Sequence, residues 1–497
     1  MRALGRRLLV HRGLGVRFAI TGADQCVASL SNFAVGVAIA RVAGIAALGA
    51  YSLAYVFWLA FADFHRALIV EPMTIDNDAR GPEAPAYIGT GLAAEVALGA
   101  ALAVPVAGAG LALLVCGQHA YGVAFVTLAP CLVFLLVQDY WRWVGFMKAM
   151  PAKALVNDVV FDVIQGAAFG ALFAIGVRSS VLAICSWGLG ALVAALFGLW
   201  QHSVTPTWRG GVARMRERWW MSRWLLAASL TSWGASQAYV VLTGIILGPV
   251  GIGGLRAAQS LVSGPSLVLL QAGGSVGLPE ASRALAERGW MGLRRVGRAV
   301  TAVGAIGVAA VAVVVLLFGR RLLVLLYGPP FARFATTADL LALSMVIGTL
   351  SLGAVLCLKT TKLTGPLFRR SLLSLVVSIA AVGVLVPLFG VVGAAGAAVA
   401  RVTAMSSSTL VLHWRRSRSA AEAVSKRPPE PSLRFGASPG LAPPSGASSP
   451  DGPGTTSAPP GWRVEGGRGV DAEDPADTRG GRSGTAYQRV LGGLQRE

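Results

Sequence analysis

The sequence predicts an all-α membrane protein of about twelve transmembrane helices, arranged as two six-helix lobes around a central cavity. A nearly unbroken series of apolar stretches runs from Phe18 to Trp414, and each is close to the roughly 20 residues that cross a bilayer. Hydrophobic residues make up 55% of the chain and charged residues 13%, against about 25% charged in soluble domains. A repeated sequence opens each half of the series and divides it into two sets of six spans.

The predicted spans follow one another with connectors too short to fold a soluble catalytic domain of about 50 residues or more. The third span has a Gly/Pro-rich centre around Pro105, which could either end the helix or bend it. In order, the spans cover residues 18–41, 47–70, 87–109, 121–140, 155–176, 179–201, 223–247, 254–279, 299–318, 337–358, 370–389 and 391–414.

Composition divides the chain into five segments. After Trp414 the sequence changes abruptly to Pro, Gly and Ser, a composition that cannot bury a core. We therefore expect the last segment to be a disordered cytoplasmic tail. The segments are a basic N-terminus at 1–17, a first lobe at 18–202, a basic connector at 203–222, a second lobe at 223–414 and the tail at 415–497.

Lys and Arg are concentrated in alternate connectors, which predicts the orientation of the chain. The first, third and fifth connectors are nearly bare, whereas most even-numbered ones are basic. Basic connectors stay on the cytoplasmic side, so both termini are predicted to be cytoplasmic. The ninth connector is an exception, because Arg320, Arg321 and Arg333 lie on its predicted external side. The formal net charge of +20 follows from this distribution, and we expect no nucleic-acid partner.

A short internal repeat opens each half. The stretch from Gly44 to Ala50 follows the first span and aligns without gaps with the stretch from Gly248 to Gly254, which follows the seventh. Each copy leads into a helix that ends beside a proline and an acid, Glu71-Pro72 in one half and Pro279-Glu280 in the other. With six spans per half, both copies point the same way across the membrane, which is the parallel-repeat plan of alternating-access transporters. The alternative is that small-residue turns recur by chance in an Ala/Gly-rich chain.

Polar side chains recur at three- and four-residue steps on the first two helices of each half, which predicts a water-filled cavity between the halves. Charged groups inside a span are costly and mark functional positions. Arg401 lies near the middle of the twelfth span and should either pair with an acid, Asp24 or Glu95, or meet an anionic substrate. Pro265 removes a backbone hydrogen bond from the eighth span and is a predicted hinge. The candidate substrate-binding residues are Arg17, Asn32, Arg66, Arg256, Gln259 and Arg401.

Other polar residues have plainer interpretations. The serines of these stripes could equally form hydrogen bonds between helices. The five histidines and five cysteines are scattered singly, and we interpret the histidines as helix-end and headgroup contacts. We expect no metal site, no disulfide framework and no cofactor.

Several helix-end patterns resemble those of the multidrug/oligosaccharidyl-lipid/polysaccharide (MOP) flippase superfamily. The likeness extends over most of the chain before the tail and is greatest to the polysaccharide-biosynthesis branch, the O-antigen and teichuronic-acid flippases. The patterns are the region Arg17 to Asn32, then Ala40-Arg41-Val42-Ala43-Gly44, Leu48-Gly49-Ala50-Tyr51, Arg66-Ala67-Leu68, Glu71-Pro72 and Leu388-Phe389-Gly390-Val391-Val392-Gly393-Ala394-Ala395.

The resemblance implies a MATE-like, two-lobed bundle that carries an undecaprenyl-pyrophosphate-linked oligosaccharide between the leaflets. Related lipid II flippases hold the pyrophosphate with arginines of the first helix, a role that Arg17 could match. Related multidrug exporters couple cations through an acid on that helix, for which Asp24 is the candidate. This chain has fewer helices than lipid II flippases, which argues against a peptidoglycan role. The implied setting is polysaccharide or lipopolysaccharide biosynthesis in a bacterial cytoplasmic membrane, with membrane lipids, a polysaccharide polymerase and glycosyltransferases as candidate partners.

Three alternatives stay open. A cation-coupled drug antiporter of the same fold would depend on Asp24, although a basic cavity would repel cations. A scaffold protein would recruit partners through the tail, which has no sharp motif. A membrane-embedded glycosyl- or acyltransferase would need clustered acids, but such acids more often pair with basic residues, here Arg142 and Lys153, so we expect no enzyme. The nearest such cluster consists of Asp139, Asn157, Asp158 and Asp162.

Overall fold

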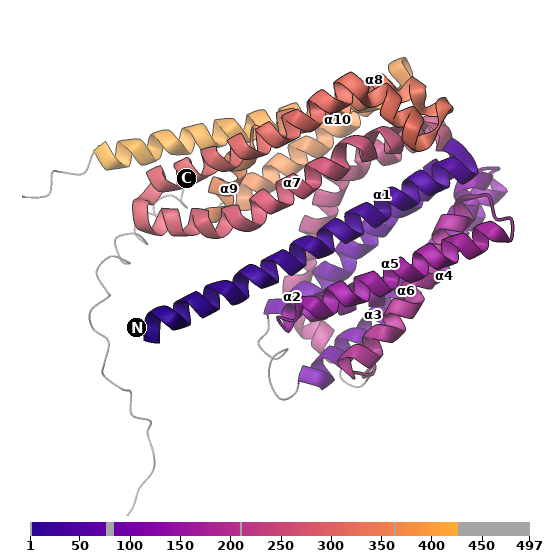
Figure 1. Cartoon of the computed structure of the whole chain (residues 1–497), viewed down its shortest axis with the longest axis horizontal. Helices are drawn as coiled ribbons and strands as arrows, with labels where there is room; N and C mark the ends of the chain where they lie inside the picture. Colours follow the sequence, from indigo (N-terminus) through magenta and orange to yellow (C-terminus); the bar gives the residue numbers. More distant parts are fainter. Residues whose placement is uncertain (1, 76–83, 209–210, 362–363, 426–497) are drawn as a thin grey trace, which may run out of the picture. The chain divides into compact units, whose positions relative to one another are not determined.

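The computed structural model describes residues 2–75, 84–208, 211–361 and 364–425. Within these ranges the chain is helical and has no strand (Figure 1). Nearly all of the predicted tail lies outside the described residues. The elements are α1 (Arg2–His65), η1 (Arg66–Val70), α2 (Glu71–Ile75), α3 (Ala84–Val115), α4 (His119–Met147), α5 (Pro151–Ala174), α6 (Ser180–His202), α7 (Gly211–Tyr327), η3 (Pro329–Phe334), α8 (Ala335–Thr349), α9 (Leu352–Thr360) and α10 (Thr364–Ser425).

Nine helical segments in the described part of the chain are long and apolar enough to cross a membrane. Four of them, Cys26–Thr74, Arg216–Gly264, Glu280–Tyr327 and Arg369–Arg415, are 47 to 49 residues long. A single crossing needs about 20 residues, so each of these four is long enough to cross twice. The chain is therefore a multi-pass, all-helical membrane protein, and the predicted fold class is confirmed.

Each of these four segments contains a glycine with a left-handed backbone. Gly44 in α1 has φ 84° and ψ −176°, Gly248 in α7 has φ 69° and ψ −169°, Gly289 in α7 has φ 59°, and Gly390 in α10 has φ 58°. A side chain would clash with the backbone at such positive φ values, which glycine adopts freely. The two glycines that open the predicted repeat therefore share one conformation at equivalent places in the two halves.

Two predicted spans differ in detail. Pro105 neither ends nor divides the third span, because α3 continues through it as one helix of 32 residues. The predicted tenth span at 337–358 is instead divided into α8 and α9. At this break Thr349 and Ser351 donate their hydroxyl hydrogens to the carbonyls of Val346 and Gly348, in competition with the helical backbone.

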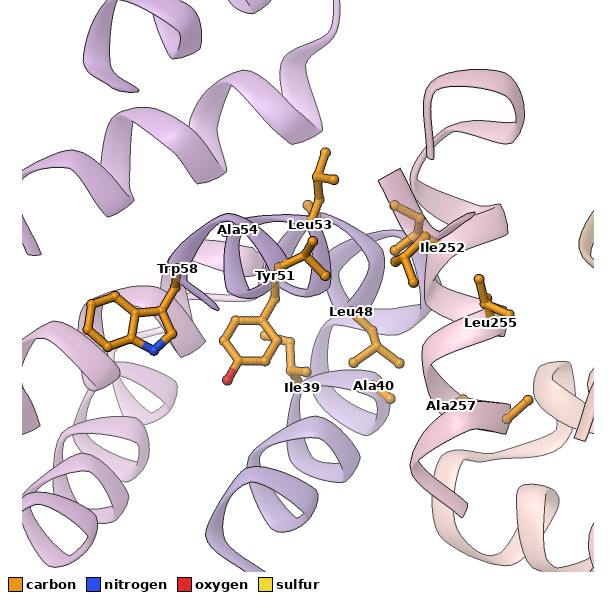
Figure 2. Packing of buried hydrophobic residues seen from close by; sticks show 14 of the residues in the cluster. Ile39, Ala40, Leu48, Tyr51, Leu53, Ala54, Trp58, Ile252, Leu255 and Ala257 are labelled. Carbon is orange, nitrogen blue, oxygen red and sulfur yellow. The ribbon is translucent and has the colours of Figure 1, made fainter. Parts of the chain in front are cut away.

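The first half packs α4, α5 and α6 on one another and on α1, with α3 against α4, whereas the second half packs α8, α9 and α10 on α7 (Figure 1). The two halves meet mainly where α1 contacts α7. Figure 2 shows Leu48 and Tyr51 of α1 in the same buried cluster as Ile252 and Leu255 of α7. The contact lies just beyond the kinks at Gly44 and Gly248, so the repeated segments themselves form the junction between the halves.

Candidate functional site

Arg256 of α7 lies at the junction between the halves. Its guanidinium carbon is 4.9 Å from the ring centroid of Tyr55, which belongs to α1. A guanidinium over an aromatic face is attracted by the ring quadrupole, an interaction of about 0.5–2 kcal/mol depending on desolvation. No ion-pair partner of Arg256 is found among the described residues. The Tyr55 ring therefore holds the charge in place, and no acid among the described residues neutralises it.

Arg401 of α10 forms a similar arrangement within the second half. Its guanidinium carbon is 5.8 Å from the ring centroid of Tyr239, which is buried, and Gln259 donates from Nε2 to the Tyr239 hydroxyl at 2.9 Å. The Arg401 Nε atom is buried and has no hydrogen-bond partner in the described part of the chain. The charges of Arg401 and Arg256 both act on the Tyr239 phenol. Three of the predicted site residues, Arg256, Gln259 and Arg401, are thus brought together around one tyrosine.

Aromatic rings continue this region into the first half. Tyr55 lies 6.3 Å from Tyr51 and 5.8 Å from Trp187 of α6, measured between ring centroids. Trp58 meets the same Trp187 edge to face at 5.5 Å. A cluster of largely buried aromatic rings therefore joins the surroundings of Arg256 to α6.

Glu95, one of the alternatives considered as a partner for Arg401, pairs with a histidine instead. Glu95 is fully buried in α3, where its Oε1 lies 3.0 Å from Nδ1 of His65. The other predicted partner, Asp24, and also Arg17 and Pro265, lie outside the residues whose side chains the structure describes; their roles stay predictions.

Arg66 does not join the other arginines. Its Nε and Nη2 atoms donate to Asp139 at 3.0 and 3.2 Å, and Nη1 lies 3.7 Å from Asp63. The guanidinium also lies 5.6 Å from the Trp143 ring. A bidentate ion pair of this kind leaves little of the guanidinium for phosphate oxygens, so Arg66 belongs to a separate polar network in the first half.

This network was missed because its central residue is a histidine. The histidines were expected at helix ends and headgroups, and His65 does lie at the end of α1, but it has 0% exposure and contacts acids from two other helices. His202 likewise lies at the end of α6 but is buried and stacks on Trp141 with a centroid separation of 5.1 Å. The signal that could have found the network is the occurrence of His65, Glu95 and Asp139 inside three neighbouring apolar spans.

The acids weighed as an enzyme cluster are largely committed to structural contacts. Arg142 Nε lies 3.1 Å from Asp158 Oδ2, and Gln138 Nε2 donates to Asp158 Oδ1 at 2.8 Å. Of the acids in this cluster, Asp158 pairs with Arg142 as expected, whereas Asp139 pairs with Arg66. Lys153 instead donates to the Gln201 carbonyl at 2.8 Å. Asn157 donates to the Ala194 carbonyl and so joins α5 to α6.

The polar stripes are satisfied within their own helices. Ser52, Ser236, Ser263 and Ser266 each donate to a carbonyl three or four residues earlier. Asn32 does the same, from Nδ2 to the Ala28 carbonyl at 2.9 Å. For these serines the structure therefore shows bonds within helices rather than the bonds between helices that were considered.

A cavity of about 350 Å³ lies away from the arginines. It is formed where the Gly248 and Gly390 turns of the second half meet η3, at one end of the bundle. Its lining includes Arg333 and the buried Thr337 but neither Arg256 nor Arg401. This cavity is therefore not the one predicted between the polar stripes of the two halves.

The arrangement of helices is similar to that of several solved transporters. An inward-facing multidrug resistance MATE family transporter of the MOP superfamily aligns with a TM-score of 0.63 and 16% identity, over 80% of this chain and 96% of that chain. The lipid II flippase MurJ in an inward closed conformation aligns with a TM-score of 0.61 and 12% identity, over 81% of this chain and 87% of that chain. A MOP superfamily transporter from Pyrococcus furiosus aligns with a TM-score of 0.57 and 14% identity, over 83% and 96%.

No family model matches the sequence, and no curated protein matches it either. The likeness to known proteins is therefore one of fold, and it agrees with the helix-end patterns of the sequence. This chain has the fold of the MOP superfamily of transporters and flippases.

Proposed function

We propose that this protein moves a polyprenyl-pyrophosphate-linked oligosaccharide across the membrane by alternating access of its two halves. The observation that carries the proposal is the placement of Arg256 and Arg401 inside membrane-spanning helices, beside tyrosines, with no ion-pair partner among the described residues. An unpaired guanidinium in a span is costly, so such groups are retained where an anion completes them.

The chemistry of the region fits a phosphorylated lipid. A guanidinium presents paired donors that match phosphate oxygens, and its attraction strengthens where water is excluded. The rings of Tyr51, Tyr55 and Trp187 offer apolar faces against which sugar rings or isoprenoid chain can pack. Arg17 is the further candidate for the pyrophosphate, on the resemblance of its helix.

The proposed setting is a bacterial cytoplasmic membrane with both termini cytoplasmic, as the basic connectors predict. In that orientation Gly44 and Gly248 lie on the external side, and the α1–α7 junction closes that side. A cargo would then enter between the halves from the cytoplasmic leaflet. Glycosyltransferases that build the lipid-linked unit and a polymerase that consumes it are the proposed functional neighbours.

The test is mass spectrometry of lipid-linked oligosaccharides, together with analysis of surface polysaccharide, in the native cell with the gene deleted and restored. Loss of the protein should make a polyprenyl-linked unit accumulate and its surface polymer disappear. Wild type should restore the polymer, whereas Arg256→Ala and Arg401→Ala should not. Arg298→Ala removes an exposed arginine and is the matched control, which should restore it fully.

A second candidate function is a cation-coupled antiporter of small molecules, with the same fold. The buried acids Glu95 and Asp139 favour it, because they give the first half groups that can bind a cation. An unchanged lipid pool in a strain with no redundant flippase, combined with an efflux defect that Asp24→Asn reproduces, would support this candidate over the flippase.

A further inference from the structure

Three helices of the first half contribute one ionisable side chain each to a buried cluster. His65 at the end of α1 lies between Glu95 of α3 and Asp139 of α4, with Nδ1 to Oε1 at 3.0 Å and Nε2 to Oδ2 at 2.7 Å. His65 and Glu95 have 0% exposure and Asp139 has 4%. Burial of this kind makes any uncompensated charge expensive, so the charges must balance locally.

The nearby arginines do not supply that balance for Glu95. Arg66 is committed to Asp139 and Arg142 to Asp158, which leaves Glu95 as the acid without a cationic side chain. Its Oε2 atom is fully buried and has no hydrogen-bond partner in the described part of the chain. Neutralisation of Glu95 therefore requires one additional positive charge within the cluster.

The geometry of His65 indicates where that charge resides. An ionised carboxylate only accepts hydrogen bonds, and a neutral imidazole has one donor and one acceptor nitrogen. Both ring nitrogens contact a carboxyl oxygen, so the two contacts need two protons. These are present when His65 is an imidazolium, or when it is neutral and one acid is protonated. In either form the cluster holds one proton more than neutral histidine and two carboxylates would hold.

We propose that His65, Glu95 and Asp139 form a proton-binding site that takes up and releases this one proton during the transport cycle. The role in transport rests on the function proposed above, whereas the existence of the site does not. The cluster is distinct from the Arg256–Arg401 region, so cargo and proton would bind at different places in the fold.

A route from the site to the rest of the molecule begins at Arg66. Its side chain is 31% exposed and contacts both Asp139, which is buried, and Asp63, which is 39% exposed. Loss of the proton leaves the cluster with one uncompensated negative charge. Arg66 is the adjacent cation, so its side chain can shift toward that charge. Arg66 also opens η1, a π-helical turn, and such turns are frequent at functional sites.

The cause of the π-helical turn connects it to the second half. Pro72 has no backbone N–H, so it cannot bond the Leu68 carbonyl four residues earlier, and its ring crowds that carbonyl. Ser222 of α7 instead donates its hydroxyl hydrogen to Leu68 at 3.4 Å. A movement of Arg66 would therefore occur two residues from Leu68, whose carbonyl accepts this hydrogen bond between the halves.

Other charged and titratable groups surround the site. Asp63 interacts electrostatically with His65 and Asp139, and Arg142 interacts with Asp139. Tyr140 lies close enough for the charge of Glu95 to act on its hydroxyl. Glu71 faces Arg66 from the outer side. The groups contributed by the packed elements are Asp63 of α1, Arg66 of η1, Glu71 of α2, Glu95 of α3, Asp139, Tyr140 and Arg142 of α4, and Asp158 of α5.

The test is infrared difference spectroscopy of the full-length protein in lipid nanodiscs between about pH 5 and about pH 10, a range that includes the ordinary pKa of histidine. Wild type should lose a buried carboxyl or imidazolium band as the pH rises, and Glu95→Gln should abolish that change. Glu217→Gln removes an exposed acid and should leave the wild-type change intact. Superimposable difference spectra for wild type and Glu95→Gln would overturn the proposal.

A second measurement tests the site even if the Glu95→Gln variant does not fold. Ring-labelled histidine in wild-type protein reports the five histidines by nuclear magnetic resonance, and Asp139→Asn and His65→Gln identify the signal of His65. An imidazole signal of His65 that changes with pH, either because the ring gains and loses a proton or because a carboxyl group bonded to it does, supports the site. A signal that is the same at every pH overturns it. Neither measurement uses cargo. A positive spectrum with an unchanged lipid pool would therefore reject the proposed cargo and keep the proton site.

Discussion

Gly49 and Gly253 make reciprocal contacts across the junction between the two halves. A Cβ atom on Gly49 would overlap the backbone carbonyl oxygen of Pro249, and a Cβ atom on Gly253 would overlap that of Ile45. In the alignment of the repeat, Gly49 corresponds to Gly253 and Ile45 corresponds to Pro249. The halves therefore meet through one contact made twice, as expected for two copies related by a pseudo-two-fold axis.

This relationship predicts that Gly49→Ala and Gly253→Ala open the junction. Forcing a methyl group into a filled space costs about 1–3 kcal/mol, which corresponds to roughly a 5- to 150-fold shift in a two-state equilibrium. Distance measurements between spin labels, one in each half, should show the closed population falling. Gly36 and Gly264 have open space where a Cβ would lie, so Gly36→Ala and Gly264→Ala should keep the wild-type distance distribution.

Arg41 ties the same junction to the end of α7. Its Nε donates to the Leu326 carbonyl at 2.7 Å, and Nη2 donates to the Leu325 carbonyl. The last carbonyls of a helix lack partners within the helix, and a cation there also meets the negative end of the helix dipole. Because Arg41 is exposed, we expect Arg41→Gln to weaken closure by only about 1 kcal/mol.

The measurement for Arg41 is the same pair of spin labels. Arg41→Lys keeps the charge and should lie between Arg41→Gln and wild type. Arg321 is an exposed arginine close to the end of the same helix, and Arg321→Gln should have no effect. Equal closed populations in Arg41→Gln and Arg321→Gln would show that the backbone contacts of Arg41 do not hold the junction.

Trp141 should be one of the main stabilising side chains of the first half. It is fully buried, donates from Nε1 to the Ala195 carbonyl at 3.1 Å, and stacks on His202. Replacement of a buried tryptophan by alanine typically costs about 3–5 kcal/mol, through lost contacts and a residual cavity. Thermal unfolding of Trp141→Ala should therefore begin well below that of wild type.

Trp200 provides the comparison for Trp141. It lies in α6, the helix against which Trp141 packs, but is 75% exposed. Trp200→Ala should change stability by no more than about 0.5 kcal/mol. A similar loss in both variants would mean that the exposed tryptophan is buried by something outside this chain, such as a second protomer or bound lipid.

The Arg142–Asp158 ion pair should be far more sensitive to disruption than the Glu287–Arg288 pair. Side-chain exposures are 17% and 6% in the first pair, against 59% and 62% in the second. Removal of one partner of a buried pair leaves an uncompensated charge and costs about 3–5 kcal/mol, whereas exposed pairs contribute about 0–1 kcal/mol. Thermal unfolding of Arg142→Ala and Glu287→Ala measures this contrast.

A double replacement separates the loss of the bond from the burial of a charge. Arg142→Met combined with Asp158→Leu removes both charges at once and should recover much of the stability lost in Arg142→Ala, because apolar residues replace buried ion pairs at little cost. Failure of the double variant to recover would indicate that Asp158 has a further structural role, for example through Gln138.

The structure brings some of the predicted site residues together and separates others. Arg256 and Gln259 were proposed from their spacing and Arg401 from its depth inside an apolar span, and all three lie around Tyr239. Arg66 was assigned to the same site, but it faces Asp139 instead. Spacing places Arg66 on a particular stripe of its helix, but it does not indicate which neighbouring helix that stripe meets.

His65 illustrates the same limit more sharply. Its partners Glu95 and Asp139 are 30 and 74 residues away, in two other helices. Each of the three residues by itself was only a polar group in an apolar span. Their combination into one buried cluster depends on how three helices are rotated about their axes.

The sequence by itself determined the fold class, the order of the spans and the glycine turns that open the two halves. The bilayer requires about 20 apolar residues for every crossing, and only glycine adopts the turn conformation freely. Spans and turns can therefore be identified from short stretches of sequence. The tertiary structure decided the rotation and partners of each helix. A helix that is apolar on all sides carries little periodic signal of which face is buried, so close packing and the few buried polar groups make that choice.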